Sequence, residues 1–212
     1  MVPGVILAAG ASSRMGRPKA LLPTATPGET FLSRLVGALA GGGLDDVVIV
    51  VGRLPDPDEA DLARALDELP PFVRPVQNPD PARGQLSSLQ TALAVIDHPG
   101  VTGMLVTLID LPLVTAATVK ALVEAHRATA APIVRPVRQG RHGHPVIFDR
   151  ALFDALRLAD PAAGARALVR AHASRAVEVP VEDEGAFVDV DTPEDYARVF
   201  GRSLPGRVSG SS

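Results

Sequence analysis

The amino-acid sequence predicts an α/β fold: a three-layer α/β/α arrangement around a mostly parallel, Rossmann-like sheet. The first observation is an alternation of short apolar runs, at 5–8, 47–51, 73–76, 104–108 and 133–137, with helical patterns at 31–40, 59–69, 87–95 and 115–128. The second is that 47–51 is apolar at every position, as expected for a strand covered on both faces. Such alternation favours helices on both sides of one sheet.

The C-terminal part of the chain has a less regular pattern. We expect strands at 143–148, 177–180 and 187–190, short helices at 151–156 and 165–171, and a last helix at 193–200. Short strands among short helices suggest an insertion that forms the wall for a second substrate. We expect residues 1–200 to form a single domain, followed by a disordered tail at 201–212 that is rich in Gly, Ser and Arg.

The composition excludes several classes of function. The 212 residues include no Cys, which excludes disulfides, thiolate metal sites and cysteine nucleophiles. Apolar residues make up 46% of the chain and aromatic residues only 3%, so the core must be aliphatic. A formal charge of −3 gives no global attraction to nucleic acid or to an anionic membrane. Without a visible signal peptide or a membrane-spanning apolar run, we expect a cytoplasmic protein.

The loop that follows the first apolar run has the composition of a phosphate-binding loop. It begins with Gly10 and contains the cations Arg14 and Lys19. We expect the loop to be exposed and to bring backbone N–H groups and both cations onto phosphates. Its spacing fits neither the Walker A pattern nor the Gly-x-Gly-x-x-Gly fingerprint. The alternative is a glycine-rich turn with two solvated cations.

Two acidic segments supply candidate metal ligands. Asp110 follows the apolar run 104–108, at the strand end where open α/β sheets bind ligands. An acid there can hold Mg²⁺, which prefers oxygen ligands, or can simply shape a turn. Asp189 and Asp191 point the same way if their segment is a strand. The following Thr192 is a good N-cap, so helix initiation explains the rest of that segment.

The opening Leu-Ala-Ala-Gly-x-Ser-x-Arg-Met-Gly-x-x-Lys at 7–19 resembles that of sugar-phosphate and molybdopterin nucleotidyltransferases, the MobA-like NTP transferase family. The resemblance extends from about residue 5 to residue 196 and is nearest to the molybdopterin cytidylyltransferases. Guanylyl-type relatives more often have a second Gly where Ala9 stands. The resemblance implies Mg²⁺-dependent transfer of CMP from CTP to the phosphate of molybdopterin, with release of pyrophosphate. It also implies a transient contact with a molybdoenzyme, and no nucleic-acid or membrane partner.

The same resemblance implies roles for individual residues. Lys19 and Arg14 would stabilise the triphosphate and the transition state, and Asp110 and Asp191 would hold the metal, with Asp189 as a second candidate. The nucleotide would also contact Leu7, Ala8, Ala9, Gly10, Ser87, Ser88 and Asp110. His144, in a Gly-His-Pro-Val-x-Phe element, and Arg166, in a Gly-Ala-Arg helix start, would bind the acceptor.

Several alternatives stay open at this point. Ser87 or Ser88 could cap a helix, His144 could hold a turn, and Arg166 could be solvated; Arg141 and His142 are expected at the surface. Ile109 stands where the family has Gly, and its side chain would narrow the space beside the metal. Two other functions also fit: a nucleotidyltransferase with a sugar phosphate or another phosphorylated acceptor, and a non-catalytic nucleotide-binding accessory protein.

Overall fold

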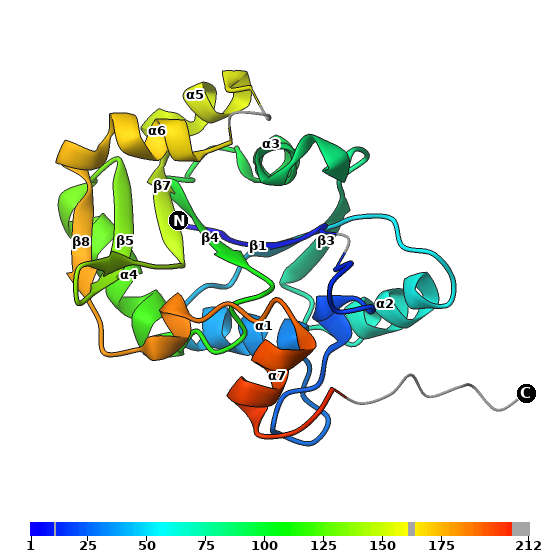
Figure 1. The fold of residues 1–212 in the computed structure, drawn as a ribbon. Helices are drawn as coiled ribbons and strands as arrows, with labels where there is room; N and C mark the ends of the chain where they lie inside the picture. The colour runs from blue at the N-terminus through cyan, green and yellow to red at the C-terminus, as the bar shows by residue number, and fades with distance from the viewer. Residues whose placement is uncertain (11, 161–163, 205–212) are drawn as a thin grey trace, which may run out of the picture.

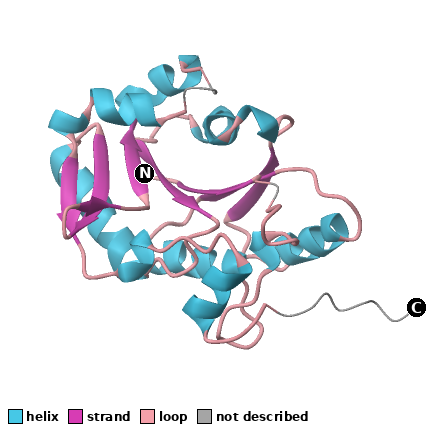
Figure 2. Ribbon diagram, in the orientation of Figure 1, coloured by secondary structure: helices cyan, strands magenta, loops and turns pink. Residues whose placement is uncertain are grey.

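The computed structural model, which describes residues 1–10, 12–160 and 164–204, has a central sheet between two layers of helices (Figures 1 and 2). The strands are β1 (Gly4–Ala8), β2 (Val47–Val51), β3 (Val73–Gln77), β4 (Gly103–Leu108), β5 (Ile133–Arg138), β6 (Arg141–His142), β7 (Val146–Asp149) and β8 (Val177–Pro180). The α-helices are α1 (Phe31–Gly41), α2 (Asp58–Asp67), α3 (Gln85–Ile96), α4 (Ala116–Thr129), α5 (Phe153–Leu158), α6 (Arg166–Ala171) and α7 (Pro193–Phe200). The predicted α/β fold is therefore confirmed.

The strand order of the sheet is β3-β2-β1-β4-β7-β5-β6, and β8 pairs with β5. Strands β3, β2, β1 and β4 are all parallel, whereas β7 runs antiparallel to both of its neighbours, β4 and β5. The chain moves outward from β1 to β3 and then returns to the other side of β1 as β4. The carboxyl ends of β1 and β4 therefore form a topological switch point, where open α/β sheets bind ligands.

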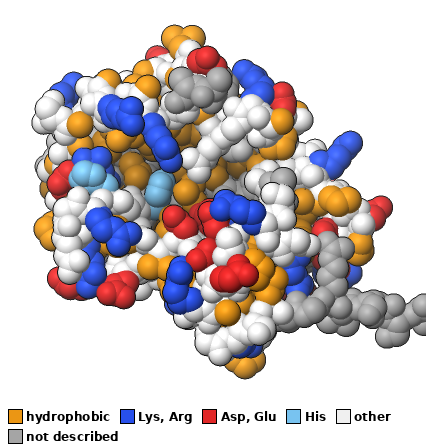
Figure 3. Space-filling model, in the orientation of Figure 1, with side chains coloured by type: hydrophobic (Ala, Val, Ile, Leu, Met, Phe, Trp, Pro, Cys, Tyr) orange, Lys and Arg blue, Asp and Glu red, His pale blue; other side chains and the backbone are white. Residues whose placement is uncertain are grey.

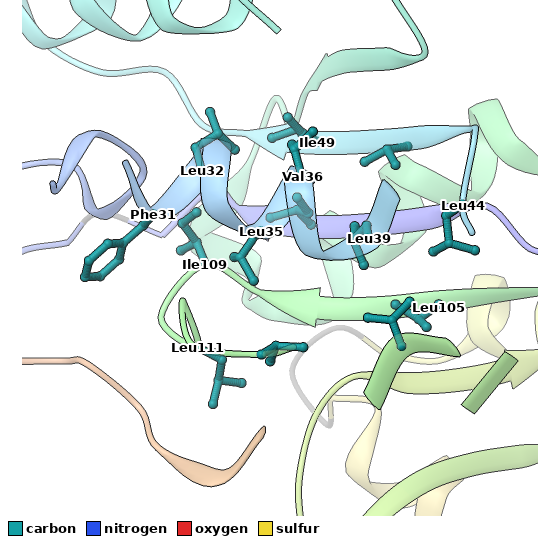
Figure 4. Close-up of a cluster of buried hydrophobic side chains, with 14 of the residues drawn as sticks. Phe31, Leu32, Leu35, Val36, Leu39, Leu44, Ile49, Leu105, Ile109 and Leu111 are labelled. Atoms are coloured by element: carbon teal, nitrogen blue, oxygen red, sulfur yellow. The ribbon is translucent and has the colours of Figure 1, made fainter. Parts of the chain in front are cut away.

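Two aliphatic cores cover the two faces of the sheet. Helices α1 and α4 pack on one face, where Leu32 and Val36 of α1 lie close to Ile49 of β2 (Figure 4). Helices α3 and α5 pack on the other face, against strand residues such as Val48. Neighbouring residues of a strand enter opposite cores because their side chains alternate.

The structure differs from the expected elements mainly in the C-terminal part. The predicted strand at 187–190 is wrong: the chain forms a 3₁₀ turn, Glu184–Phe187, followed by extended residues. Its backbone bonds go to loops at the edge of the sheet, including Val190 N–H to Asp110 O at 2.8 Å, so it forms no ladder. Most of the expected tail at 201–212 lies outside the described residues, which end at Leu204. None of the helices in the described part of the chain has both the length and the apolar character needed to span a bilayer.

Gly185 allows the 3₁₀ turn Glu184–Phe187 to approach the loop after β4. A Cβ atom at Gly185 would overlap the backbone carbonyl of Leu113, which cannot rotate away. We expect Gly185→Ala to lower the free energy of unfolding by about 2–3 kcal/mol, as in overpacked cores. The control Gly37→Ala, in α1, adds a Cβ with nothing within 4 Å and should raise stability by about 0.5–1 kcal/mol. Urea unfolding measures both changes, and a stable Gly185→Ala variant would contradict the close approach.

Candidate active site

A cavity of about 360 Å³ opens at the carboxyl ends of β1 and β4. Its lining comes from four parts of the chain: the end of β1 with its loop, residues 81–88 around the start of α3, the end of β4 with the residues that follow it, and the segment that precedes α7. The lining residues are Leu7, Ala9, Gly10, Ser12, Ser13, Arg14, Lys19, Pro81, Gly84, Gln85, Ser88, Leu108, Ile109, Asp110 and Asp191. On the face shown in Figure 3, acidic side chains gather near the centre beside basic ones.

The end of β1 presents alternate residues to this cavity. Leu7 and Ala9 line it and belong to the core on the α3 face. The side chain of Ala8, which we expected to contact the nucleotide, packs instead against the core on the α1 face. This difference follows from strand geometry, because successive side chains point to opposite faces. Ile109 lines the cavity as expected, and its N–H donates to Leu7 O at 3.1 Å.

The loop after β1 is held in place by its own residues. The side chain of Met15 is buried in the core on the α1 face. The hydroxyl of Ser12 accepts a hydrogen bond from Lys19 N–H at 3.2 Å, so it joins the two ends of the loop. Gly16 has φ of 67°, a left-handed conformation that favours glycine. These contacts direct both cations of the loop toward the carboxylates described next.

Lys19 and Arg14 both contact Asp191. The ammonium of Lys19 donates to Asp191 Oδ1 and lies 3.4 Å from Asp110 Oδ2, while Arg14 Nη2 donates to Asp191 Oδ2 at 2.9 Å. The side chain of Lys19 is only 10% exposed, so the expectation of an exposed lysine is wrong. Burial of this cation is tolerated because two carboxylates compensate it. The hydrogen bond from Lys19, helped by Arg14, holds the pKa of Asp191 below its ordinary value.

A backbone hydrogen bond brings the two acidic segments together. Val190 is fully buried and donates its N–H to Asp110 O at 2.8 Å. Thr192 and Asp195 form a capping box that fixes the start of α7 directly after Asp191, as the sequence predicts. Burial and the negative charges of Asp110 and Asp191 raise the pKa of Asp189. Negative charge is therefore in excess where the segments meet.

Asp110 and Asp191 suit a divalent cation whose remaining ligands come from a bound substrate and from water. Asp110 Oδ1 is buried without a hydrogen-bond partner in the described part of the chain, so it is available to a cation. Among residues 1–10, 12–160 and 164–204, however, no three His, Cys, Asp or Glu side chains converge on a common metal position. Mg²⁺ ordinarily takes one or two carboxylates together with substrate phosphates and waters. Asp110 and Asp191 match that donor set.

The two serines of α3 have different surroundings. Ser88 lines the cavity, whereas the hydroxyl of Ser87 is buried and donates to Gly84 O at 2.7 Å. Neither serine caps the helix, because the N-cap is Gly84 and has no side-chain cap. Asn78, just after β3, donates to Ser87 Oγ at 2.9 Å and to Ser88 Oγ at 3.0 Å. Asn78 was not among the predicted site residues, although a polar residue directly after a strand is a usable signal.

The two residues expected to bind the acceptor lie outside the lining of this cavity. His144 donates its backbone N–H to Ala186 O at 2.9 Å, and its Nδ1 is buried without a described partner. Burial lowers the pKa of His144, although the backbone of Val106 and then the charge of Asp110 partly oppose this effect. Arg166 is exposed at the first residue of α6.

A cavity at a switch point that holds two cations and two carboxylates is the arrangement expected of an enzyme that acts on phosphorylated substrates. The chain belongs to the MobA-like NTP transferase family, whose model matches residues 4–177. The predicted family and the predicted enzyme class, a nucleotidyltransferase, are thus confirmed.

Full-length relatives of this chain have different names. Nicotine blue oxidoreductase of Paenarthrobacter nicotinovorans is 35% identical over 206 residues, covering 94% of this chain and 96% of that protein. Molybdenum cofactor guanylyltransferase of Rhizobium meliloti is 31% identical over 204 residues, covering 91% and 88%. The structure of Rv0371c from Mycobacterium tuberculosis H37Rv has a TM-score of 0.77 at 32% identity, covering 95% and 97%. A manganese complex of Rv0371c has a TM-score of 0.75 at 30% identity, covering 94% and 98%.

Proposed function

We propose that this protein, as a single domain of residues 1–200, transfers CMP from CTP to the phosphate of molybdopterin. The observation that supports this most is the placement of Lys19, Arg14, Asp110 and Asp191 around one cavity at the switch point. In the reaction, an oxygen of the acceptor phosphate attacks the α-phosphorus of CTP. The bond from the α-phosphorus to the bridging oxygen breaks, and pyrophosphate leaves with that electron pair. This chemistry requires positioning and charge neutralisation rather than a protein nucleophile.

The residues of the site would divide these tasks. Lys19 and Arg14 would place positive charge on the triphosphate and on the charge that develops in the transition state. Asp110 and Asp191 would hold the divalent cation, Mg²⁺ in our proposal, which neutralises phosphate charge when bound. The manganese complex of Rv0371c supports a divalent cation in this family. A product bound in this way would be delivered by transient contact with a molybdoenzyme.

A screen for pyrophosphate release tests the proposal. The protein is incubated with Mg²⁺, each of the four common NTPs and a panel of phosphorylated acceptors that includes molybdopterin and sugar phosphates. Release that requires CTP and molybdopterin is the expected result. Pyrophosphate release with sugar phosphates but not with molybdopterin would show that the acceptor is a sugar phosphate. Nucleotide binding without pyrophosphate release under any condition would indicate a non-catalytic accessory protein.

The end of β1 supports CTP as the nucleotide. The side chain of Ala9 lines the cavity, next to the phosphate loop, and takes space that a purine would need. The backbone of Gly52 lies close to that of Ala9, since a Cβ built on Gly52 would lie 2.8 Å from Ala9 O. Ser88 adds a hydroxyl that can both donate to and accept from a base edge. GTP is the nucleotide to compare with CTP, because two relatives are named as guanylyltransferases.

We expect kcat/KM to be at least about tenfold higher for CTP than for GTP, because unpaired polar groups penalise the wrong base. Ala9→Gly should reduce this ratio by about fourfold, which corresponds to the removal of one methyl group. Ala8→Gly is the matched control, because its side chain faces the opposite core. Steady-state kinetics with one acceptor measure the ratios. Equal use of both nucleotides by the unmodified protein would refute the base assignment.

A further inference from the structure

Residues 22–30, which connect the phosphate loop to α1, form a compact loop beside the active site. Within this 22–30 loop, Thr24 N–H donates to Glu29 O at 2.9 Å. The hydroxyl of Thr24, which is buried, also donates to the carboxylate of Glu29. The loop begins directly after the 3₁₀ turn that carries Lys19. Its internal hydrogen bonds give it a defined shape next to that lysine.

Helix α7 holds the 22–30 loop from the side of Asp191. Tyr196 is fully buried and donates its hydroxyl to Pro23 O at 2.8 Å. The ring of Tyr196 stacks on that of Phe31, at the start of α1, with the ring centres 6.2 Å apart. Because α7 begins directly after Asp191 and its cap, the 22–30 loop is tied to the segment that supplies this carboxylate.

Arg34 ties the 22–30 loop to the other acidic segment. Arg34 lies on α1, and its Nε donates to Pro112 O at 2.9 Å, two residues after Asp110. Its Nη1 donates to Glu29 Oε2 at 3.3 Å. The guanidinium is planar and its donors have a fixed geometry, so two bonds to two different partners determine its orientation. The side chains of Arg34 and Glu29 are both partly buried, which limits competition from water.

Apolar packing alone does not set the direction of Asp110. Its neighbours Ile109 and Leu111 are buried in the core on the α1 face (Figure 4). Such contacts are non-directional, whereas hydrogen bonds depend on direction. Val190 N–H supplies one directional contact to the backbone of this segment, from the side of α7. Arg34 supplies another from the side of α1.

The position of Asp110 matters on both sides of its carboxylate. Oδ2 lies 3.4 Å from Lys19 Nζ, and Oδ1 is buried without a hydrogen-bond partner in the part of the chain that the structure describes. Arg34 itself does not line the cavity at the switch point. A displacement of about 1 Å at a reacting centre can cost a large factor in rate even when its cause lies outside that centre. The hydrogen bond from Arg34 is therefore placed to affect the site through geometry alone.

We propose that Arg34 is a positioning residue for Asp110: its hydrogen bond to the backbone sets where that carboxylate lies relative to Lys19 and to the divalent cation. The proposal rests on the proposed nucleotidyl transfer for the cation and the nucleotide, but not for the contact with Lys19. Glu29 neutralises the guanidinium, so Arg34 adds little net charge to the site.

Two substitutions separate the bond to Pro112 from the charge of Arg34. In Arg34→Gln, the side-chain amide nitrogen is as many bonds from the backbone as arginine Nε, so it can still donate to Pro112 O, although the contact with Glu29 is lost. Arg34→Met has a similar length and no donor, and it should stay folded because the replaced side chain is partly exposed. The matched control is Arg74→Met, which removes an ion pair with Asp46 at the opposite edge of the sheet.

The lysines of the chain provide a measurement that needs no nucleotide. Lys19 and Lys120 are the only two, so protein made with isotope-labelled lysine gives side-chain NMR signals from these residues alone. Arg34→Met should shift the Lys19 signal, because the contact with Asp110 changes, and should leave the Lys120 signal in place. Arg34→Gln and Arg74→Met should keep the Lys19 signal within its linewidth.

Calorimetry of CTP binding measures the effect on the cation site. The Mg²⁺ concentration that gives half of the effect on binding should rise about tenfold in Arg34→Met, as when other groups that orient metal ligands are removed. It should stay within about twofold in Arg34→Gln and Arg74→Met. CTP binding without Mg²⁺ should be the same in all of these proteins. Thermal unfolding measures stability separately, since a purely structural role would lower the Tm of Arg34→Met and nothing else.

The outcomes distinguish this proposal from the proposed function. An unshifted Lys19 signal or an unchanged Mg²⁺ requirement in Arg34→Met would overturn the positioning role and leave nucleotidyl transfer intact. Equal effects of Arg34→Gln and Arg34→Met would also overturn it, because the charge rather than the bond to Pro112 would then be responsible. If the unmodified protein binds no CTP at any Mg²⁺ concentration, the proposed function fails. A shifted Lys19 signal in Arg34→Met would in that case still support the positioning of Asp110 by Arg34.

Discussion

Lys19→Met is expected to lower kcat/KM for nucleotidyl transfer by about 10²–10³-fold, the loss seen when one preorganised charge-stabilising donor is removed. The reason lies in the position of Lys19. Its ammonium lies between Asp110 and Asp191, and its side chain is 10% exposed, so a positive charge is already fixed where the triphosphate would bind. Methionine retains much of the side-chain volume, so the loss of charge is separated from the loss of packing.

Lys120→Met is the control for this variant. Lys120 lies on α4, and its side chain is 67% exposed and 4.0 Å from Glu124, so activity and stability should be unchanged. Pyrophosphate release at saturating acceptor gives the rates, and circular dichroism gives the fold. Turnover of Lys19→Met within about threefold of the unmodified protein, with an unchanged spectrum, would exclude a role for Lys19 in transition-state stabilisation.

The same variant changes how stability depends on pH. In the unmodified protein the hydrogen bond from Lys19 keeps the pKa of Asp191 below the ordinary value of 3.8. A lowered pKa stabilises the folded state at pH values above 3.8, and this contribution disappears as the pH falls through the folded-state pKa. Lys19→Met should therefore reduce stability at neutral pH more than at pH 3. Urea unfolding at both pH values measures this difference, and an equal change at both would contradict the ion pair.

The sequence predicts the fold best where apolar patterns are continuous. Val47–Val51 is fully buried in β2, between β1 and β3, as its unbroken apolar run indicates. The segment 187–190 was predicted wrongly for a tertiary reason. Its alternating pattern satisfies a strand, but Gly185 packs on Leu113 and Val190 bonds to Asp110, so the chain crosses the edge of the sheet instead of joining it. A local pattern contains no information about these distant partners.

The sequence predicts which segments of the chain meet at the cavity, but not which of their side chains line it. The sequence indicates that the loop after β1 and the acids after β4 meet at one edge, because both follow parallel strands. Which side chains line the cavity changes from one residue to the next along the chain. Ala9 lines the cavity and Ala8 does not, and Ser88 lines it and Ser87 does not. Arg141 was expected only as a surface residue. Its contact with Phe187 joins β6 to a turn 46 residues away, and no local spacing shows that.

Asp110→Asn and Asp191→Asn are each expected to weaken Mg²⁺-dependent binding of CTP by about tenfold or more, since each removes a formal charge from the proposed metal ligands. Asparagine has the same shape as aspartate and keeps one oxygen as a hydrogen-bond acceptor. The contact with Lys19 can therefore persist, and the fold should be retained. Calorimetry of CTP binding with and without Mg²⁺ measures the effect without relying on turnover. Binding in the absence of Mg²⁺ should change little or become tighter, because a negative charge facing the triphosphate is lost.

Asp189→Asn is the matched comparison, because Asp189 lies on the same extended segment as Asp191 but does not line the cavity at the switch point. Asp191 contacts both cations of the phosphate loop, whereas Asp189 has a raised pKa, caused by burial and by its acidic neighbours. A carboxylate that tends to hold a proton competes less well for a cation than one that stays ionised. We therefore expect Asp189→Asn to keep most of the Mg²⁺ effect. If Asp189→Asn abolishes that effect and Asp191→Asn leaves it intact, then Asp189 is the second metal ligand and Asp191 serves only to position Lys19 and Arg14.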